Sequence, residues 1–367
     1  MSRLRTFALL TSGFALAGAG AHCGARTGFF EASGAAPGPD AGSREASPPD
    51  ASTPDASGLD ADAIDAGLPD RMVPASGAIL FGGIGTADNG EYVYDDTWLF
   101  DGAAWYELHP PAAPSQRVYA AAARLGTQEV LFGGSAPYVG PSYADTWTYG
   151  DATWTLGASP AAMAPRDGSV MAALGGAVVL FGGTTGESSF SDTWTWSGAV
   201  WTQVMTSPSP EARGYAAMVT MGKRVVLFGG LDQAVQWVGD TWTWDGASWT
   251  QQSPKASPSA RSLMAAATAP DGTMLIFGGE QGSDGKVLDE TWAYDGTTWT
   301  QRHPATSPPA RLGAVMTTLG GKVYLYGGDG SFSDDELSDT WVWDGVTWAL
   351  VNVDGPPGRV AATWVSP

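Results

Sequence analysis

The chain has 367 residues, including 50 glycines, 25 prolines and 17 tryptophans, and a formal net charge of −20. Abundant Gly and aromatic residues with few charged ones indicate an all-β protein rich in tight turns. The negative charge excludes the nucleic-acid-binding class, which needs a basic surface, and excludes electrostatic docking on anionic lipid.

Residues 1–22 are typical of a signal peptide, because Arg3 and Arg5 precede a short apolar stretch that ends in small residues. The only cysteine, Cys23, follows directly, so the segment resembles a bacterial lipoprotein signal, although His22 stands where such signals prefer a small residue. We therefore expect an exported protein, lipidated at Cys23 and held at the outer membrane. The alternative is a periplasmic or secreted protein with a free thiol.

Residues 23–74 are dominated by Ala, Asp, Pro, Ser and Gly, and an acidic residue recurs at every fifth position (Asp40, Glu45, Asp50, Asp55, Asp60, Asp65 and Asp70). Such a segment cannot bury enough apolar surface to offset the entropy of ordering, so it is predicted to be a disordered linker. Behind a lipidated cysteine it would hold a domain away from a membrane.

Six repeats of 47 to 51 residues follow, each marked by an apolar run that ends in Gly-Gly, such as "VVLFGG". Short β-branched and aromatic runs bounded by Gly predict buried strands. The first glycines of the pairs are Gly82, Gly133, Gly182, Gly229, Gly278 and Gly327.

Each repeat continues with two tryptophans seven residues apart, as in "GDTWTWDGASWT" from Gly239 to Thr250. If Asp245 and Gly246 form a two-residue type I′ turn, then Trp242 lies directly opposite Trp249 on the neighbouring strand. The motif is therefore predicted to be a hairpin whose tryptophans pack against each other.

A strand of small residues, opened by an arginine, precedes the last five Gly-Gly pairs. The first repeat lacks this strand, and the chain instead ends with a copy of it, "GRVAATWVSP". Four strands per repeat predict an all-β, six-bladed β-propeller over residues 75–367, with four antiparallel strands per blade. Its first blade would be completed by the C-terminal strand.

This pattern resembles the kelch repeat, which implies a propeller but no particular activity. The repeated arginines are Arg117, Arg166, Arg213, Arg261, Arg311 and Arg359. One arginine at the same place in every blade indicates a structural role, bonded to carbonyls or to the acid before each first tryptophan (Asp96, Asp145, Asp192, Asp240, Glu290 and Asp339). The alternative is that these arginines contact a ligand.

No catalytic, metal-binding or cofactor-binding constellation is predicted. Copper-radical oxidases also resemble kelch propellers, but they need a cysteine cross-linked to tyrosine, and Cys23 lies outside the repeats. The loop at residues 329–336 contains several oxygen-bearing side chains, so binding of Ca²⁺ by this loop stays an open alternative.

Diversity is concentrated in the loops between the second and third strands, which share one face with the blade connections. The aromatic candidates for ligand binding are Tyr92, Tyr94, Tyr138, Tyr143, Phe190, Trp237 and Phe332, and the acidic ones are Glu91, Asp232 and Glu336. Aromatic faces beside acceptors suit a sugar or a basic peptide.

We therefore expect a monomeric, non-catalytic binding propeller at the bacterial cell envelope, with a protein or carbohydrate partner and no nucleic acid. The alternatives are a carbohydrate-active enzyme or sugar mutarotase, with acids such as Glu91 and Glu336, and a purely structural envelope protein.

Overall fold

The computed structural model describes residues 73–74, 76–87, 90–136, 140–160, 162–330 and 336–365. The predicted signal peptide, Cys23, nearly all of the predicted linker, Tyr138 and Phe332 lie outside the described residues, as does the side chain of Glu91. The predictions made for them stay predictions.

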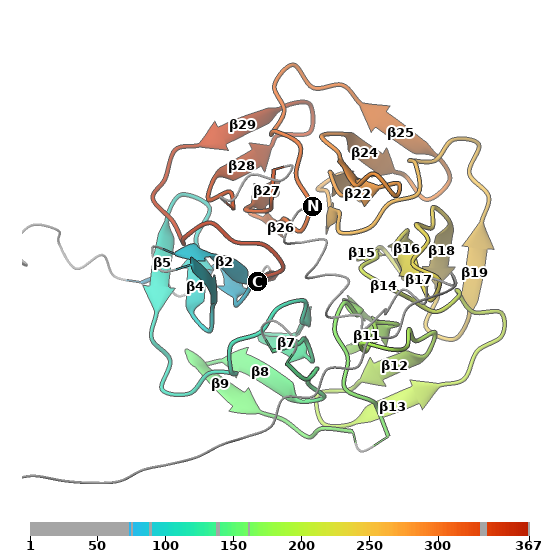
Figure 1. Ribbon diagram of the computed structural model, residues 1–367, viewed down its shortest axis with the longest axis horizontal. Coiled ribbons are helices and arrows are strands. Elements are labelled where there is room, and N and C mark those ends of the chain that lie inside the picture. The colour runs from blue at the N-terminus through green and yellow to red at the C-terminus, as the bar shows by residue number, and fades with distance from the viewer. Residues whose placement is uncertain are drawn as a thin grey trace, which may run out of the picture. The chain divides into compact units, whose positions relative to one another are not determined.

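Six antiparallel sheets of four strands surround a central axis, as the six-bladed prediction required (Figure 1). From the axis outward, blade 1 is β30 (Thr363–Val365), β1 (Ala78–Phe81), β4 (Thr97–Phe100) and β5 (Trp105–Leu108); blade 2 is β6 (Ala121–Leu125), β7 (Gln128–Phe132), β8 (Thr146–Gly150) and β9 (Thr153–Leu156); and blade 3 is β10 (Val170–Leu174), β11 (Ala177–Phe181), β12 (Thr193–Trp196) and β13 (Trp201–Val204).

The other three blades repeat this order. Blade 4 is β15 (Ala217–Met221), β16 (Arg224–Phe228), β18 (Thr241–Trp244) and β19 (Trp249–Gln252); blade 5 is β20 (Ala265–Thr268), β21 (Met274–Phe277), β24 (Thr291–Tyr294) and β25 (Trp299–Arg302); and blade 6 is β26 (Val315–Leu319), β27 (Lys322–Tyr326), β28 (Thr340–Trp343) and β29 (Trp348–Val351).

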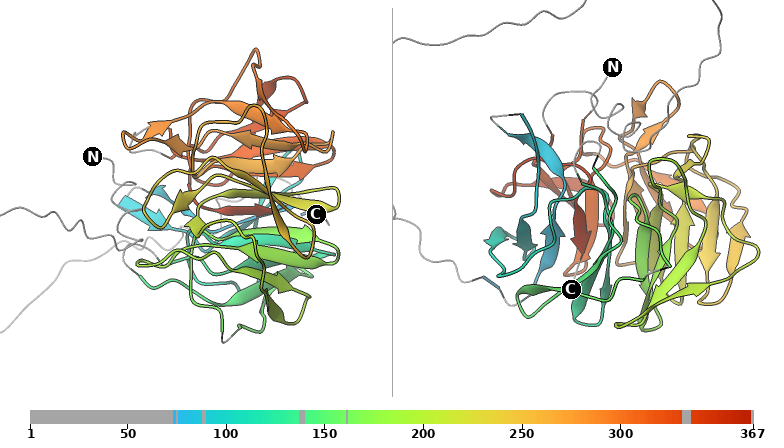
Figure 2. Two further views of the ribbon diagram at one scale, coloured as in Figure 1. Left: turned by 90° about the vertical axis from the view of Figure 1, so that its right-hand side faces the viewer. Right: turned by 60° about the horizontal axis from the view of Figure 1, so that its bottom comes forward.

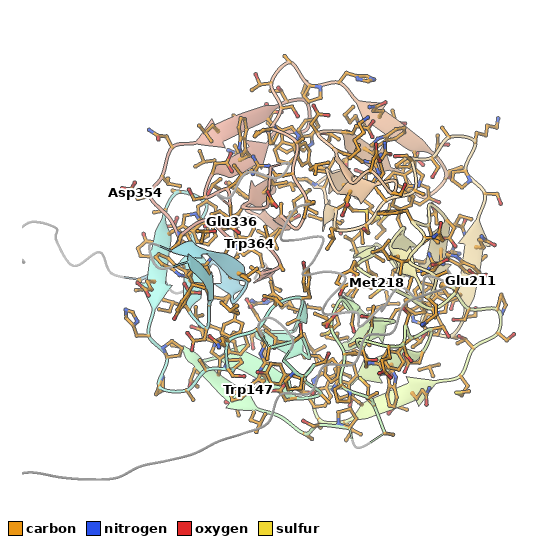
Figure 3. The ribbon with its side chains drawn as sticks, viewed as in Figure 1. Trp147, Glu211, Met218, Glu336, Asp354 and Trp364 are labelled. Carbon is orange, nitrogen blue, oxygen red and sulfur yellow. The ribbon has the colours of Figure 1, made fainter. Side chains whose placement is uncertain are left out.

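The core lies between neighbouring blades. The Gly-Gly strand is buried on both faces, so it has no polar alternation, and Val226 and Phe228 of β16 pack toward blade 5 while Val225 and Leu227 pack toward blade 3. Met218 and Trp364 lie toward the axis, whereas Glu211 and Asp354 lie at the rim (Figure 3).

The C-terminal strand closes the ring, as predicted. β30 pairs with β1 in antiparallel register, with Ile79 opposite Val365 and Phe81 opposite Thr363. Its Trp364 is buried and stacks on Trp105 with ring centroids 5.2 Å apart. The two ends of the propeller thus share one blade, which leaves no open inner edge.

The predicted register of the tryptophan hairpins is wrong. Trp244, and not Trp242, lies opposite Trp249, because the loop at residues 245–248 has four residues. Asp245 Oδ1 accepts the backbone N–H groups of Ala247 and Ser248, and Gly246 has a φ of +104°, so the aspartate side chain stabilises a wider turn than type I′. Among the six tryptophan hairpins, only that of blade 2 has a two-residue turn, at Asp151 and Ala152, one residue later than expected.

The second tryptophan of each hairpin joins two blades. Its indole Nε1–H donates to the threonine that opens the third strand of the preceding blade, at 2.8–3.1 Å. The pairs, in chain order, are Trp105–Thr340, Trp154–Thr97, Trp201–Thr146, Trp249–Thr193, Trp299–Thr241 and Trp348–Thr291. The tryptophan motif therefore has a structural role, as expected, but its second tryptophan stabilises the contact between neighbouring blades.

Three further two-stranded sheets lie on the variable loops and connections, and the sequence did not predict them. They are β2 (Ile84–Ala87) with β3 (Gly90–Val93), β14 (Arg213–Gly214) with β17 (Leu231–Asp232), and β22 (Glu280–Gln281) with β23 (Lys286–Val287). The hairpins β2–β3, in blue, and β22–β23, in orange, project from the same face of the ring (Figure 2). Within the described residues, no helix is long and apolar enough to cross a membrane.

Candidate functional site

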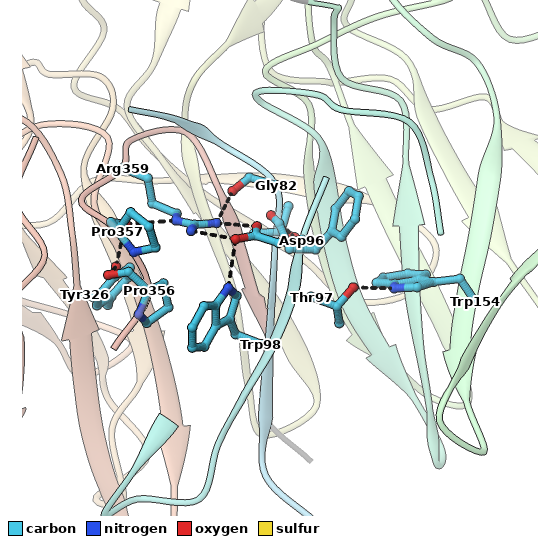
Figure 4. A network of polar contacts seen from close by, with 11 residues as sticks. Gly82, Asp96, Thr97, Trp98, Trp154, Tyr326, Pro356, Pro357 and Arg359 are labelled. Atoms are coloured by element: carbon cyan, nitrogen blue, oxygen red, sulfur yellow. Dashed lines mark hydrogen bonds and ion pairs between the residues drawn. The ribbon is translucent and has the colours of Figure 1, made fainter. Parts of the chain in front are cut away.

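The six repeated arginines are buried inside the blades, each with at most 2% of its surface exposed. Arg359 shows the shared geometry: its two terminal nitrogens donate to the two carboxylate oxygens of Asp96 at 2.6 and 2.8 Å, and one of them also donates to the Gly82 carbonyl (Figure 4). The predicted partners are all present, as Arg117–Asp145, Arg166–Asp192, Arg213–Asp240, Arg261–Glu290, Arg311–Asp339 and Arg359–Asp96.

The first tryptophan of each hairpin completes this network. Trp98 Nε1–H donates to Asp96 at 2.8 Å, and the equivalent bond recurs in the other five blades. Burial acts to raise the pKa of Asp339, but the hydrogen bonds and charge of Arg311 outweigh it and hold that pKa below its ordinary value. The arginines are thus fully engaged within the blades.

Three of the aromatics predicted to bind a ligand belong to this structural network. The Arg359 guanidinium lies 4.0 Å from the ring centroid of Tyr94, that of Arg117 lies 4.4 Å from Tyr143, and that of Arg166 lies 3.9 Å from Phe190. All three aromatics stand two residues before the paired acid. Their rings cover the guanidinium groups through cation–π contacts, so this position is part of the repeat.

A closed ring of backbone hydrogen bonds surrounds the axis at the loop face. The second residue after each arginine has a φ between +56° and +63°, and its N–H donates to the carbonyl of its counterpart in the preceding blade at 2.8–3.0 Å. The six members are Tyr119, Gly168, Tyr215, Leu263, Gly313 and Ala361. Left-handed φ values are costly for side chains other than glycine, so the six-fold closure must hold the other four there.

Two tyrosines of this ring pack against each other near the axis. Tyr119 and Tyr215 meet edge to face with ring centroids 5.1 Å apart. Gly168 lies between them in sequence order, and any Cβ there would stand 2.7 Å from the Tyr215 ring. The Tyr215 hydroxyl donates to buried Asp167 at 2.8 Å, which places a carboxyl group beneath the loop face.

Burial raises the pKa of Asp167 to about 6, although the Tyr215 hydroxyl acts to lower it. Because the folded pKa lies above its ordinary value of 3.8, the contribution of Asp167 to stability is greatest below 3.8 and is lost as the pH rises through about 6. We therefore expect Asp167→Asn, which keeps an acceptor for Tyr215, to raise the free energy of unfolding at pH 8 by about 1–3 kcal/mol. The gain should be about 1 kcal/mol smaller at pH 5.

Urea unfolding at both pH values checks this expectation, with the exposed Glu107→Gln as the control of equal charge change. A gain that is the same at pH 5 and pH 8 would show that the ionised carboxylate is not the destabilising group.

A cavity of about 680 Å³ opens on the loop face, and blades 3, 4 and 5 build its walls. Blade 3 contributes Thr184, Thr185 and Ser189, and Tyr215 and Ala260 also line the cavity. The loop after β16 contributes Leu231, Asp232, Val235, Gln236 and Trp237, and the β22–β23 hairpin contributes Glu280, Gln281, Gly282, Ser283, Asp284 and Lys286. The cavity falls within the range of about 300–1,000 Å³ that is usual for ligand sites. Of the predicted binding residues, the structure brings Trp237 and Asp232 together here.

Asp232 organises the loop that carries Trp237. Its Oδ1 accepts the backbone N–H groups of Ala234 and Gln236, both at 2.8 Å, and the backbone of Leu231 bridges that of Trp237. Val235 is held at a φ of +58°, which is a strained conformation for a β-branched residue. Strain of this kind clusters at ligand sites, where the surroundings fix the loop.

Of the remaining candidates, Tyr92 and Glu336, whose side chains the structure describes, lie away from this cavity. Tyr92 is 49% exposed and packs edge to face on Tyr94, with centroids 5.1 Å apart. Glu336 Oε2 accepts the backbone N–H of Thr86 at 2.8 Å, which links the loops of blades 6 and 1. In the part of the chain that the structure describes, no three His, Cys, Asp or Glu side chains form a group that could hold a metal ion.

Comparison with known families agrees with this architecture. The model of the KLHDC2/KLHL20/DRC7 Kelch-repeats domain matches residues 75–257, 159–300 and 243–365, which together span the propeller. A search of curated proteins finds no match. The arginine–acid pairs and the Gly-Gly strands recur in every blade of the matched range, and the six blades close into one ring. The chain therefore belongs to the kelch-repeat β-propeller family.

Proposed function

We propose that the protein is a non-catalytic binding propeller that recognises a protein or a glycan through the variable loops of one face. The observation that carries this proposal is the cavity of about 680 Å³ between blades 3 and 5, which contains Trp237 and Asp232. Two further facts support it: kelch propellers generally mediate protein interactions, and the strained Val235 lines the same cavity.

The test is binding of the purified protein to a broad array of glycans and peptides, beside its Trp237→Ala variant. We expect a saturable ligand whose affinity falls at least tenfold in the variant, because a large aromatic face is lost from the cavity. Val346→Ala is the control, since it removes an exposed apolar side chain from the tryptophan-hairpin turn of blade 6, outside the variable loops. A ligand that Trp237→Ala leaves unaffected would place the site elsewhere, and no ligand for the folded protein would favour the purely structural alternative.

We further propose that the propeller is exported and held at the bacterial cell envelope by a lipid on Cys23. The sequence of residues 1–23 supports this proposal, through its resemblance to a lipoprotein signal. Metabolic labelling with palmitate should mark the wild-type protein and leave Cys23→Ala unlabelled. Label that persists in Cys23→Ala, or an unlabelled wild type, would contradict it.

A further inference from the structure

The large cavity between blades 3, 4 and 5 carries an excess of negative charge. Asp232 and Asp284 line it, together with Glu280, which already has a partner, and the described lining contains one basic residue, Lys286. Beneath it lies a fourth carboxyl group, because Asp167 accepts from Tyr215 at 2.8 Å and bridges the backbone of Thr184, and both of these residues line the cavity. With a net charge of −20 on the whole chain, this face attracts cations and repels anions.

Two aromatic side chains, Trp237 and Tyr215, line the same cavity from different segments of blade 4. An aromatic face beside carboxylates is the environment that a guanidinium or ammonium group prefers, because the ring quadrupole and the negative charges attract the cation together. The protein uses this chemistry within its own blades, where Arg166 lies 3.9 Å from the Phe190 centroid and is paired with Asp192.

The rest of the cavity lining suits the other parts of a lysine or arginine residue, which are its methylene groups and the peptide groups on either side. Leu231 and Val235 offer apolar surface for the methylene groups of a long side chain. Ser189, Gln236, Gln281 and Ser283 offer hydrogen-bonding groups of both kinds, which suits the peptide groups that flank a side chain. A small polyamine offers no such carbonyl groups, and a neutral sugar gains nothing from an excess of carboxylates.

Resting on the binding function proposed above, we infer that this cavity takes the lysine or arginine side chain of an extended basic peptide segment of a partner protein. The carboxylates select the charge, the aromatic rings hold the cation, and the polar rim binds the adjoining backbone. The site is off the propeller axis and belongs to three blades only, so it uses what differs between the repeats.

The experiment measures binding of fluorescently labelled nonapeptides to the full protein by anisotropy. The peptides differ only in the central residue, which is arginine, citrulline, lysine or acetyl-lysine, so each pair keeps its shape and loses one charge. We expect the cationic peptides to bind at least tenfold more tightly than their neutral partners. Unlabelled spermidine and a glycan array serve as competitors from other chemical classes.

The cavity variant is Asp232→Asn with Asp284→Asn, in which position 232 keeps an oxygen for the N–H groups that it caps. Its matched control is Glu107→Gln with Asp354→Asn, which removes the same charge from exposed positions on blade 1 and the blade 6–1 connection. We expect the cavity variant to lose at least tenfold in affinity for the arginine peptide and the control less than twofold.

Several results would overturn the inference while the proposed function stands: equal affinity for arginine and citrulline peptides, equal losses in the cavity variant and the control, or a glycan that binds saturably where no peptide does. Failure of the folded protein to bind any peptide or glycan would overturn both. Circular dichroism of each variant separates loss of binding from loss of folding.

Discussion

Deletion of residues 359–367 is expected to leave a chain that does not fold to a stable ring. The truncation removes the inner strand of blade 1, the Arg359 pair with Asp96 and the buried Trp364, and it exposes the edge of β1. Loss of a buried tryptophan alone costs about 3–5 kcal/mol, and breaking a buried ion pair costs a similar amount, which together approach the whole stability of an ordinary domain.

Size-exclusion chromatography and near-UV circular dichroism check this, because an unpaired β1 promotes aggregation. Deletion of residues 366–367 alone is the control and should be silent. A synthetic peptide of residues 359–365 added in trans should restore part of the near-UV signal. A truncated protein that is monomeric and cooperatively folded would show that the C-terminal strand is dispensable for closure.

Replacement of a blade arginine should also be severely destabilising, with Arg311→Met expected to cost about 3–5 kcal/mol at pH 7. The change leaves Asp339 and the Gly327 carbonyl without the guanidinium that bonds both of them at 2.7–2.9 Å. Arg311→Lys should recover only part of the loss, because an ammonium group cannot bond both carboxylate oxygens and the carbonyl in the planar arrangement. Arg224→Met, at an exposed position on β16, is the control and should change stability by less than about 0.5 kcal/mol.

Urea unfolding of the three variants measures these differences. The pKa of Asp339 is lowered in the folded protein, so the stabilisation from its pair is complete near neutral pH and is lost as the pH falls below its ordinary value of 3.8. The cost of Arg311→Met should therefore shrink in acid. A cost that is small at pH 7, or equal for methionine and lysine, would contradict the view that the bidentate pair holds the blade together.

The blades themselves could be predicted because their features recur six times at nearly constant spacing. The Gly-Gly strands, the tryptophan strands, the arginine–acid pairs and the C-terminal closure are all confirmed. The turn register was wrong for a local reason. The Asp-Gly sequence favours a two-residue turn, but the Asp245 side chain accepts two N–H groups and stabilises a four-residue loop instead.

The arginine-covering aromatics were missed although the sequence held the signal. Tyr94, Tyr143 and Phe190 all stand two residues before an acid, and the same position holds Val238, Leu288 and Leu337 in the other blades. Because half of the blades use an aliphatic residue there, the aromatic ones resemble independent insertions. The position is defined by its backbone, which bonds the arginine that opens the next repeat, as when Arg213 N–H donates to Phe190 O.

The site was predictable only in part. Trp237 and Asp232 stand out because they break the repeat, and both line the cavity. Tyr215, Thr184 and Glu280 occupy repeat positions on three different blades, and only the closure of the ring brings them together. The ring of residues with left-handed φ values could not be predicted from the amino-acid types, since four of its six members are not glycine.

The completion of blade 1 by the C-terminal strand also affects how quickly the protein reaches its native state. Arg359 and Asp96 are 263 positions apart, and Thr363 bonds Phe81 across 282 positions, so the contacts that complete the ring are among the most distant the chain can make. Contacts of such high order slow folding, because the chain must lose the entropy of a very long loop before they form. Blades 2 to 6 can assemble as they leave the ribosome, but the ring can close only after the last strand has emerged.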